Sequence, residues 1–178
     1  MSRVIEVIDY QSTWPELFAD ECKLFKTHLG DTVVKVHHIG STAVVGLAAK
    51  PVIDIILEVT SLVDLDYQQT LMTKLGYTAK GENGIVGRRF FIKGGDARSH
   101  HVHAFEYGDA HVKRHLAFRD YLRRNPEIAH QYGQIKKQAA AQCSRDEGDH
   151  DAALYCQLKD EFVAYHEKLA LEACHRPQ

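Results

Sequence analysis

The sequence has 178 residues, a length typical of one domain that buries a single core. Its 44% hydrophobic and 26% charged residues match a globular chain, which excludes disordered, collagen-like and low-complexity proteins. The 22 Lys and Arg residues against 24 Asp and Glu residues leave a net charge of −2, which gives no overall attraction to nucleic acid or to an anionic membrane.

The first half of the chain alternates helical and extended patterns. Apolar residues at intervals of four, three and four predict a first helix that ends before Gly30. Ser61 is the expected cap of the second helix, and Gly76 follows its end. In chain order we predict a helix over 14–29, strands over 32–38 and 51–59 joined by a loop over 39–49, a helix over 62–75, and strands over 88–93 and 101–107.

The second half is predicted to be helical throughout, over 110–124, 126–143 and 149–173. Two apolar stripes at helical spacing are expected to face the core: Ile128, Tyr132, Ile135 and Ala139, and Leu158, Phe162, Tyr165 and Leu169. A mixed sheet followed by helices indicates the α+β class. We therefore expect one domain over 1–178, with an α/β core over about 1–109 and a helical part over about 110–175.

The most informative stretch joins the first two predicted strands. The strand ends in Gly40-Ser41, and glycine lets a backbone approach a ligand closely. The hydroxyls of Ser41 and Thr42, with nearby N–H groups, can hold a phosphate, and Lys50 would add a cation. Asp54, within an apolar strand, must point into the interior or into a cleft that holds a cation. The alternative is an ordinary turn, with a buried Asp54 carboxylate satisfied by backbone amides or by Lys50.

Four segments of the chain resemble the GrpB family, small bacterial proteins assigned to the nucleotidyltransferase superfamily. The resemblance spans essentially the whole chain and rests on VHHIGSTAVVGLAAKPVIDI, GIVGRRFFIKG, HHVHAFEYG and RHLAFRDYLRRNPEIAHQYGQIKKQAA. It implies a nucleotidyltransferase-like mixed sheet, a Gly-Ser turn that holds nucleotide phosphates and strand carboxylates that hold Mg²⁺ or Mn²⁺. In some relatives a similar module is fused to a dephospho-coenzyme A kinase.

The resemblance carries over to particular residues, with one departure. Gly40 and Ser41 match the phosphate-binding turn, and Asp54 matches the first metal-ligating acid. Active nucleotidyltransferases usually have a second acid two residues later, where both carboxylates share one strand face and bind two metals. This chain has Ile56 there. Glu58 is roughly 13 Å from Asp54 along a strand, too far to share its ion.

Histidines on the last predicted strand offer another route to a metal site. His101 and His103 share a face, whereas His100 points the other way. With Asp54 they could bind a divalent ion, and imidazole ligands favour a transition metal such as Zn²⁺. Alternatively, one histidine lies satisfied in the core and another is exposed. His103 is also a candidate general base, paired with Asp54 as a catalytic residue.

Further basic residues complete the set of phosphate-binding candidates. Arg88 and Arg89 are adjacent on a predicted strand, so one of them is expected to face the cleft as a phosphate clamp. Lys136 could reach the same cleft, although a helical lysine more often faces solvent. His111 and His115 have metal-ligand spacing, but the Glu of a zinc-protease motif is absent, and His115 is expected beside Phe118 and Leu122.

Two functions follow from this sequence. The first is a metal-dependent nucleotidyltransferase that acts on a nucleotide and a small acceptor, and the second is a nucleotide- or coenzyme A-binding module without turnover, which Ile56 favours. Acidic residues near the N-terminus argue against a signal peptide, and no apolar run reaches the ~20 residues of a membrane helix. The sequence therefore predicts a cytoplasmic protein with a small-molecule ligand.

Overall fold

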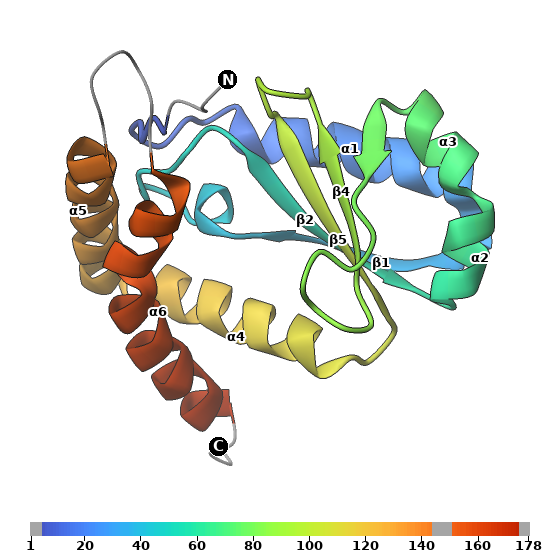
Figure 1. The fold of residues 1–178 in the computed structure, drawn as a ribbon. Helices are drawn as coiled ribbons and strands as arrows, with labels where there is room; N and C mark the ends of the chain where they lie inside the picture. Colours follow the sequence, from blue (N-terminus) through green and yellow to red (C-terminus); the bar gives the residue numbers. More distant parts are fainter. Residues whose placement is uncertain (1–4, 144–150, 175–178) are drawn as a thin grey trace.

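A computed structural model describes residues 5–143 and 151–174. Within these residues, five strands form one mixed sheet in the order β1-β2-β5-β4-β3 (Figure 1). The strands are β1 (Val33–Ile39), β2 (Ile53–Val59), β3 (Tyr77–Ala79), β4 (Arg89–Lys93) and β5 (His100–Glu106). The central pair β2 and β5 is parallel, and the other neighbours are antiparallel. This parallel pair brings the starts of β2 and β5 to the same end of the sheet.

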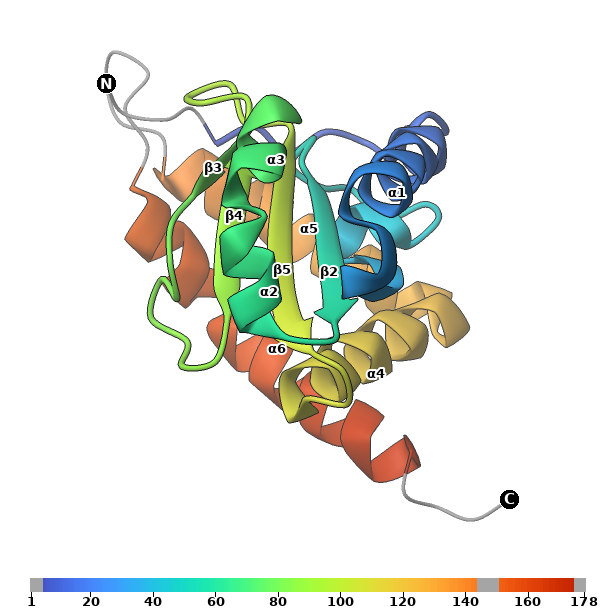
Figure 2. The same cartoon turned by 90° about the vertical axis from the view of Figure 1, so that its right-hand side faces the viewer.

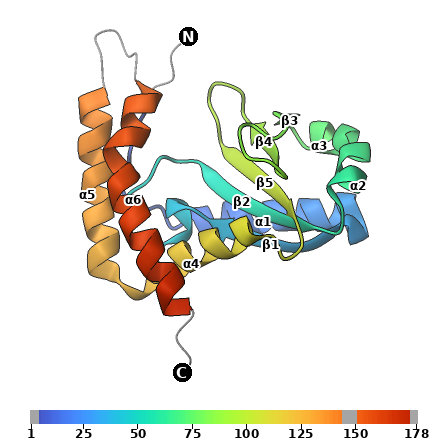
Figure 3. The ribbon, with the colours of Figure 1, turned by 60° about the horizontal axis from the view of Figure 1, so that its bottom comes forward.

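Helices cover both faces of the sheet and extend beyond it. The helices are α1 (Trp14–Leu29), α2 (Leu62–Tyr67), α3 (Gln69–Lys74), α4 (Ala110–Arg124), α5 (Pro126–Cys143) and α6 (Ala152–Cys174). Helices α1, α2 and α3 lie on one face and α4 lies on the other (Figure 2). Helices α5 and α6 pack side by side past the end of the sheet, and α6 also packs on α4 (Figure 3). The C-terminal helices therefore form a wall next to the starts of β2 and β5.

The helix starts follow from capping residues. Ser61 Oγ accepts a hydrogen bond from the Asp64 N–H at 3.3 Å, which confirms its predicted role as the cap of α2. Asp109 Oδ1 accepts from the His111 N–H at 2.7 Å at the start of α4. Helix α5 begins at Pro126, whose missing N–H costs nothing in a first turn.

The two faces of β2 pack into different cores. Ile55 and Leu57 point toward α1, α2 and α3, where they contact a cluster that includes Phe25. Ile56 points the other way, into a cluster with Phe105 and with Val112 of α4. Because side chains alternate along a strand, Asp54 lies on the same face as Ile56. Its carboxylate therefore lies on the α4 side of the sheet.

The fold class was predicted correctly as α+β, with a mixed sheet and a helical C-terminal half. The helix predicted over 62–75 is two helices, which meet where the Gln68 side chain turns aside to donate to Thr32 Oγ1 at 2.8 Å. Strand β3 was not predicted because its three residues are too few to show alternation. Residues 149–150 of the last predicted helix lie outside the described residues.

The predicted core stripe of α6 is partly wrong. Leu158 and Tyr165 are 39% and 62% exposed, because α6 is an outer helix that buries one side only. The buried side instead carries Tyr155, His166 and Ala170. Of the helices in the described ranges, none has both the length and the hydrophobicity that a bilayer crossing requires.

Candidate functional site

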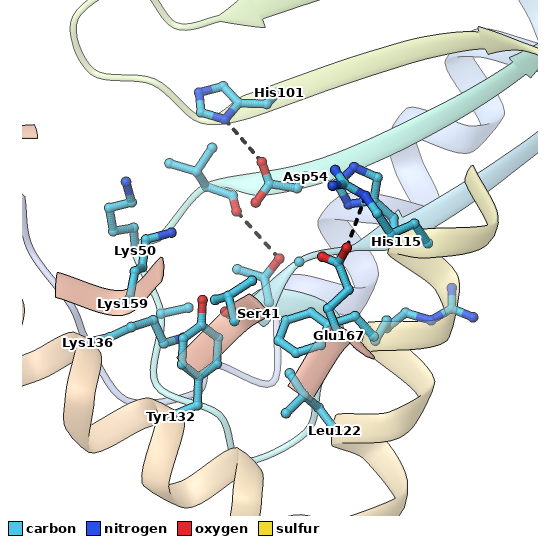
Figure 4. Close-up of a pocket in the computed structure, with 18 of the residues that line it drawn as sticks. Ser41, Lys50, Asp54, His101, His115, Leu122, Tyr132, Lys136, Lys159 and Glu167 are labelled. Carbon is cyan, nitrogen blue, oxygen red and sulfur yellow. Dashed lines mark hydrogen bonds and ion pairs between the residues drawn. The ribbon is translucent and has the colours of Figure 1, made fainter. Parts of the chain in front are cut away.

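A cavity of about 410 Å³ lies where the starts of β2 and β5 meet the C-terminal helices (Figure 4). The loop between β1 and β2 forms one wall and helices α4, α5 and α6 form the others. The charged or hydrogen-bonding side chains that line it are Ser41, Thr42, Lys50, Asp54, His101, Arg114, His115, Arg119, Tyr132, Lys136, Tyr155, Lys159 and Glu167. The fold thus brings the predicted turn, the strand acid and three helices to one place.

The Gly40-Ser41 turn presses directly against Asp54. Gly40 has φ +69°, and a Cβ atom at this position would lie 2.7 Å from Asp54 Oδ2. Only glycine combines this backbone conformation with so close an approach. Ser41 begins a short 3-10 turn, η2 (Ser41–Ala43), and lines the cavity. The turn and the acid that the sequence singled out therefore lie in direct contact.

The hydroxyl of Thr42 forms hydrogen bonds within the loop region. His38 Nε2 donates to Thr42 Oγ1 at 3.0 Å, and Thr42 Oγ1 donates to the Val52 carbonyl at 3.5 Å. Thr42 is 2% exposed, so its hydroxyl joins the two ends of the loop. Its predicted phosphate-binding role would require that hydroxyl to exchange partners.

Asp54 and His101 form a pair across β2 and β5. They are register partners in the parallel ladder, and His101 Nδ1 donates to Asp54 Oδ1 at 3.1 Å. Burial alone would raise the pKa of Asp54, but the hydrogen bond from His101 and nearby positive charge outweigh it and hold the pKa below its usual range. Asp54 is therefore an ionised carboxylate at the cavity wall.

His103 does not join this pair, contrary to the expectation of a three-residue metal site. Its Nδ1 accepts a hydrogen bond from Arg88 Nη1 at 3.2 Å, and it does not line the cavity. Burial lowers the pKa of His103 to about 4, so the ring is neutral at pH 7. Within the described ranges, no three His, Cys, Asp or Glu side chains are grouped so that they could hold a metal ion. His100 faces away from this site, toward Ser99 Oγ, as predicted.

The two candidate arginines are engaged elsewhere, so the expectation that one of them faces the cleft is wrong. Arg88 is 6% exposed and donates to the carbonyls of Glu82 and Asn83 at 3.1 and 2.6 Å, which fastens the loop before β4. Arg89 forms two 2.8 Å hydrogen bonds with the Asp66 carboxylate of α2. Neither guanidinium lines the cavity.

Three lysines gather at one end of the cavity, and we call Lys50, Lys136 and Lys159 the lysine cluster. Lys136 is 3% exposed, its Nζ lies 4.5 Å from the centre of the Tyr132 ring, and no described residue accepts a hydrogen bond from it. Lys50 and Lys159 place their Nζ atoms 4.7 and 5.5 Å from the centre of the Tyr155 ring. Burial, with the charges of the other two lysines, lowers the pKa of Lys136 to about 7.

The opposite end of the cavity has a mixed charge. Arg114 Nε and Glu167 Oε1 form an ion pair at 3.4 Å. His115 lines the cavity beside them, and burial lowers its pKa to about 4. Figure 4 shows Asp54 and Ser41 between this end and the lysine cluster.

Sequence reasoning missed Lys159, Tyr155, Arg114 and Glu167 as cavity residues. Tyr155, Lys159 and Glu167 are on α6 and Arg114 is on α4. Helical spacing shows which residues share a face of a helix, but it does not show which surface that face contacts. This arrangement of an ionised acid, a glycine turn and clustered lysines can hold an anionic ligand together with a cation.

Comparison with known proteins assigns the chain to a family. Residues 4–168 match the family described as GrpB protein. The UPF0157 protein YqkA of Bacillus subtilis is 45% identical over 163 residues, which cover 90% of this chain and 46% of YqkA, so this chain spans about half the length of that relative. The crystal structure of conserved protein GrpB from Enterococcus faecalis has 40% identity and a TM-score of 0.86, and the match covers 96% of this chain and 100% of that one.

A weaker structural likeness involves terminal uridylyl transferase 4 from Trypanosoma brucei with bound UTP. It has 16% identity and a TM-score of 0.49, and covers 94% of this chain and 52% of that chain. An identity and a TM-score this low support no conclusion about function. The family match and the Enterococcus structure extend over nearly the whole chain, and this protein therefore belongs to the GrpB family.

Proposed function

We propose that this chain binds a nucleotide in the cavity, with phosphates between the Gly40-Ser41 turn and the lysine cluster and a divalent cation at Asp54. The observation that carries the proposal is that the turn, an ionised Asp54 and three lysines line one cavity of about 410 Å³. Phosphate oxygens suit both backbone N–H groups and ammonium groups. The volume lies in the range of small-molecule sites.

The donor set fits one cation rather than two. Asp54 and His101 are in contact, whereas the position of a second acid holds Ile56, which is fully buried among Phe105 and Val112. A cation with few protein ligands suits Mg²⁺ or Mn²⁺, which commonly take their remaining ligands from phosphates and water. Such an ion would neutralise charge on the phosphates.

Nucleotidyl transfer to a small acceptor extends this proposal. The lysine cluster would stabilise the negative charge of the departing pyrophosphate. His115 is a neutral imidazole that lines the cavity, so it replaces His103 as the candidate acceptor of the proton from the attacking hydroxyl. The alternative is a nucleotide- or coenzyme A-binding module without turnover, which the buried Ile56 favours.

The test is a thermal-shift panel of ATP, UTP, CTP, GTP and coenzyme A, each with Mg²⁺, Mn²⁺ or Zn²⁺. A ligand at 100 times its Kd stabilises by about 2.7 kcal/mol, which corresponds to a shift of several degrees. We expect a metal-dependent nucleotide shift that Asp54→Asn abolishes. The matched control Asp66→Asn removes an exposed acid that pairs with Arg89 outside the cavity and should retain the shift.

No nucleotide shift with any of the metals would overturn the proposal. Pyrophosphate release that depends on Asp54 would identify a transferase, and binding without release would identify a module. Release that survives Asp54→Asn would contradict transfer chemistry at this site.

A further inference from the structure

Lys136 lies in surroundings that do not suit an ammonium ion. It is on α5 and 3% exposed, and its Nζ lies over the Tyr132 ring with no hydrogen-bond partner in the part of the chain that the structure describes. Lysine is among the residues least often fully buried, and an unpaired buried charge is costly. Yet its side chain lines the cavity, where a ligand could contact it.

Burial is the main cause of the lowered pKa of Lys136, and charged groups on the neighbouring elements modify it. Lys159 of α6 and Lys50 of the β1–β2 loop disfavour its charge, and Asp54 of β2 favours it. Burial raises the pKa of Tyr132 and of Tyr155 well above the usual range, so both phenols are neutral. With the pKa of Lys136 lowered to about 7, much of the amine is unprotonated at neutral pH.

We propose that Lys136 is an anion-binding residue that is partly unprotonated at neutral pH in the ligand-free cavity and takes up a proton when a polyphosphate group binds beside it. The inference rests on the proposed function in one respect, the placement of phosphates in this cavity. Negative charge close to Nζ favours the ammonium form, and phosphate oxygens supply acceptors that the described residues around Nζ do not. Binding and protonation of Lys136 must therefore strengthen each other.

The test is calorimetric titration at pH 8.0 with two probes, ATP and inorganic triphosphate, each with Mg²⁺, in buffers of different ionisation enthalpy. The dependence of the binding enthalpy on the buffer gives the number of protons taken up. At pH 8.0 an amine with a pKa of about 7 is roughly 10% protonated, so uptake should approach about 0.9 proton per site. At pH 6.0 the uptake by Lys136 should fall to near zero.

Three variants distinguish the effect of a positive charge at position 136 on binding from the uptake of a proton by Lys136. Lys136→Met should weaken binding by tenfold or more and abolish the uptake. Lys136→Arg keeps a charge that does not titrate, so it should bind without uptake. The matched control Lys137→Met removes the neighbouring lysine of α5, which pairs with Asp9 at 2.6 Å outside the cavity, and should change neither quantity. Melting curves establish that each variant is folded.

The outcomes distinguish this inference from the proposed function. If ATP binds with no proton uptake, or with the same uptake in Lys136→Met, the inference is wrong and nucleotide binding stands. If inorganic triphosphate binds with uptake and ATP does not bind, the inference stands and the nucleotide proposal fails. If neither probe binds, both fail.

Discussion

Gly40 and Asp54 lie so close together that each constrains the other. The left-handed backbone of Gly40 places its α-carbon against the Asp54 carboxylate, where a methyl group would meet Oδ2 at 2.7 Å. Gly40→Ala therefore combines backbone strain of about 1–2 kcal/mol with displacement of the acid that we propose binds a cation. We expect a loss of 2–4 kcal/mol, roughly, in the free energy of unfolding and a tenfold or greater loss of metal-dependent ligand binding.

Gly46 provides the matched control for this prediction. It has φ +79°, but a Cβ atom there would meet nothing within 4 Å. Gly46→Ala should therefore show the cost of the backbone conformation alone, about 1 kcal/mol, and bind ligand normally. Urea unfolding and titration of both variants measure the two effects. Equal losses in both variants would contradict a specific role for the approach of Gly40 to Asp54.

At the level of single residues, the sequence indicated those site residues that lie near one another in the sequence. Gly40, Ser41 and Asp54 flank one loop and follow from local pattern. Lys159 and Glu167 could not be predicted, because their role depends on which face of α6 lines the cavity, and the packing of α6 on α4 and α5 decides this. His103 shares a strand face with His101 as predicted, but a guanidinium donates to it, and sequence spacing does not reveal such a partner.

On the α4 side of strand β2, a buried apolar residue occupies the position where a second metal-binding acid would lie. Ile56 is fully buried in contact with a cluster that contains Phe105 and Val112. Ile56→Asp would introduce the second acid that the proposed transfer chemistry lacks, but it would bury a carboxylate among apolar side chains. We expect a destabilisation of about 4 kcal/mol or more, or a chain that does not fold, and no gain in metal-dependent turnover.

Ile56→Val is the control: it shows whether the loss of stability in Ile56→Asp comes from the buried charge or would follow any substitution of Ile56. It removes one methylene and should cost only about 0.5–1.5 kcal/mol. Denaturant unfolding of both variants, with a pyrophosphate-release assay, measures the outcome. A stable Ile56→Asp protein with new metal-dependent turnover would show that the core around Ile56 can admit a second acid.

The periodic pattern of apolar residues predicted the bounds of long elements more accurately than those of short ones. The bounds of α1, α4 and α5 match their predicted ranges because each has three or more turns of pattern and a clear stop signal. The three residues of β3 and the break at Gln68 depend on tertiary partners. The stripe assigned to α6 was misplaced because an outer helix exposes apolar residues beside its buried face, and the pattern alone does not fix the boundary.

At the level of the whole molecule, the cavity exists because segments that are distant in the sequence converge. The loop after β1 and the start of β2 meet α4, α5 and α6, so that Lys50 and Lys159 lie over the same Tyr155 ring. A site built in this way depends on the packing of the helical half against the sheet. Conditions that loosen that packing should therefore affect both stability and ligand binding.

Acid pH should loosen this packing through buried histidines. His38 lies behind the loop, where its ring stacks on Phe18 at 4.7 Å and its Nε2 donates to Thr42. Burial lowers its pKa to about 4, and His103 and His115 shift in the same direction. The unfolded chain, with histidine pKa values near 6.5, therefore binds more protons than the folded chain between about pH 6.5 and 4. The free energy of unfolding should fall as the pH is lowered through this window.

Urea unfolding at pH 7.5, 6.0 and 5.0 measures this loss. We expect His38 to contribute about 1–2 kcal/mol of it, so that His38→Gln depends less on pH than the wild type does, even if it is less stable at pH 7.5. The control His130→Gln changes an exposed histidine of α5 and should leave the pH dependence unchanged. An identical pH dependence in wild type and His38→Gln would show that the loop admits a protonated His38. In that case the hydrogen bond from His38 to Thr42 does not depend on a neutral ring.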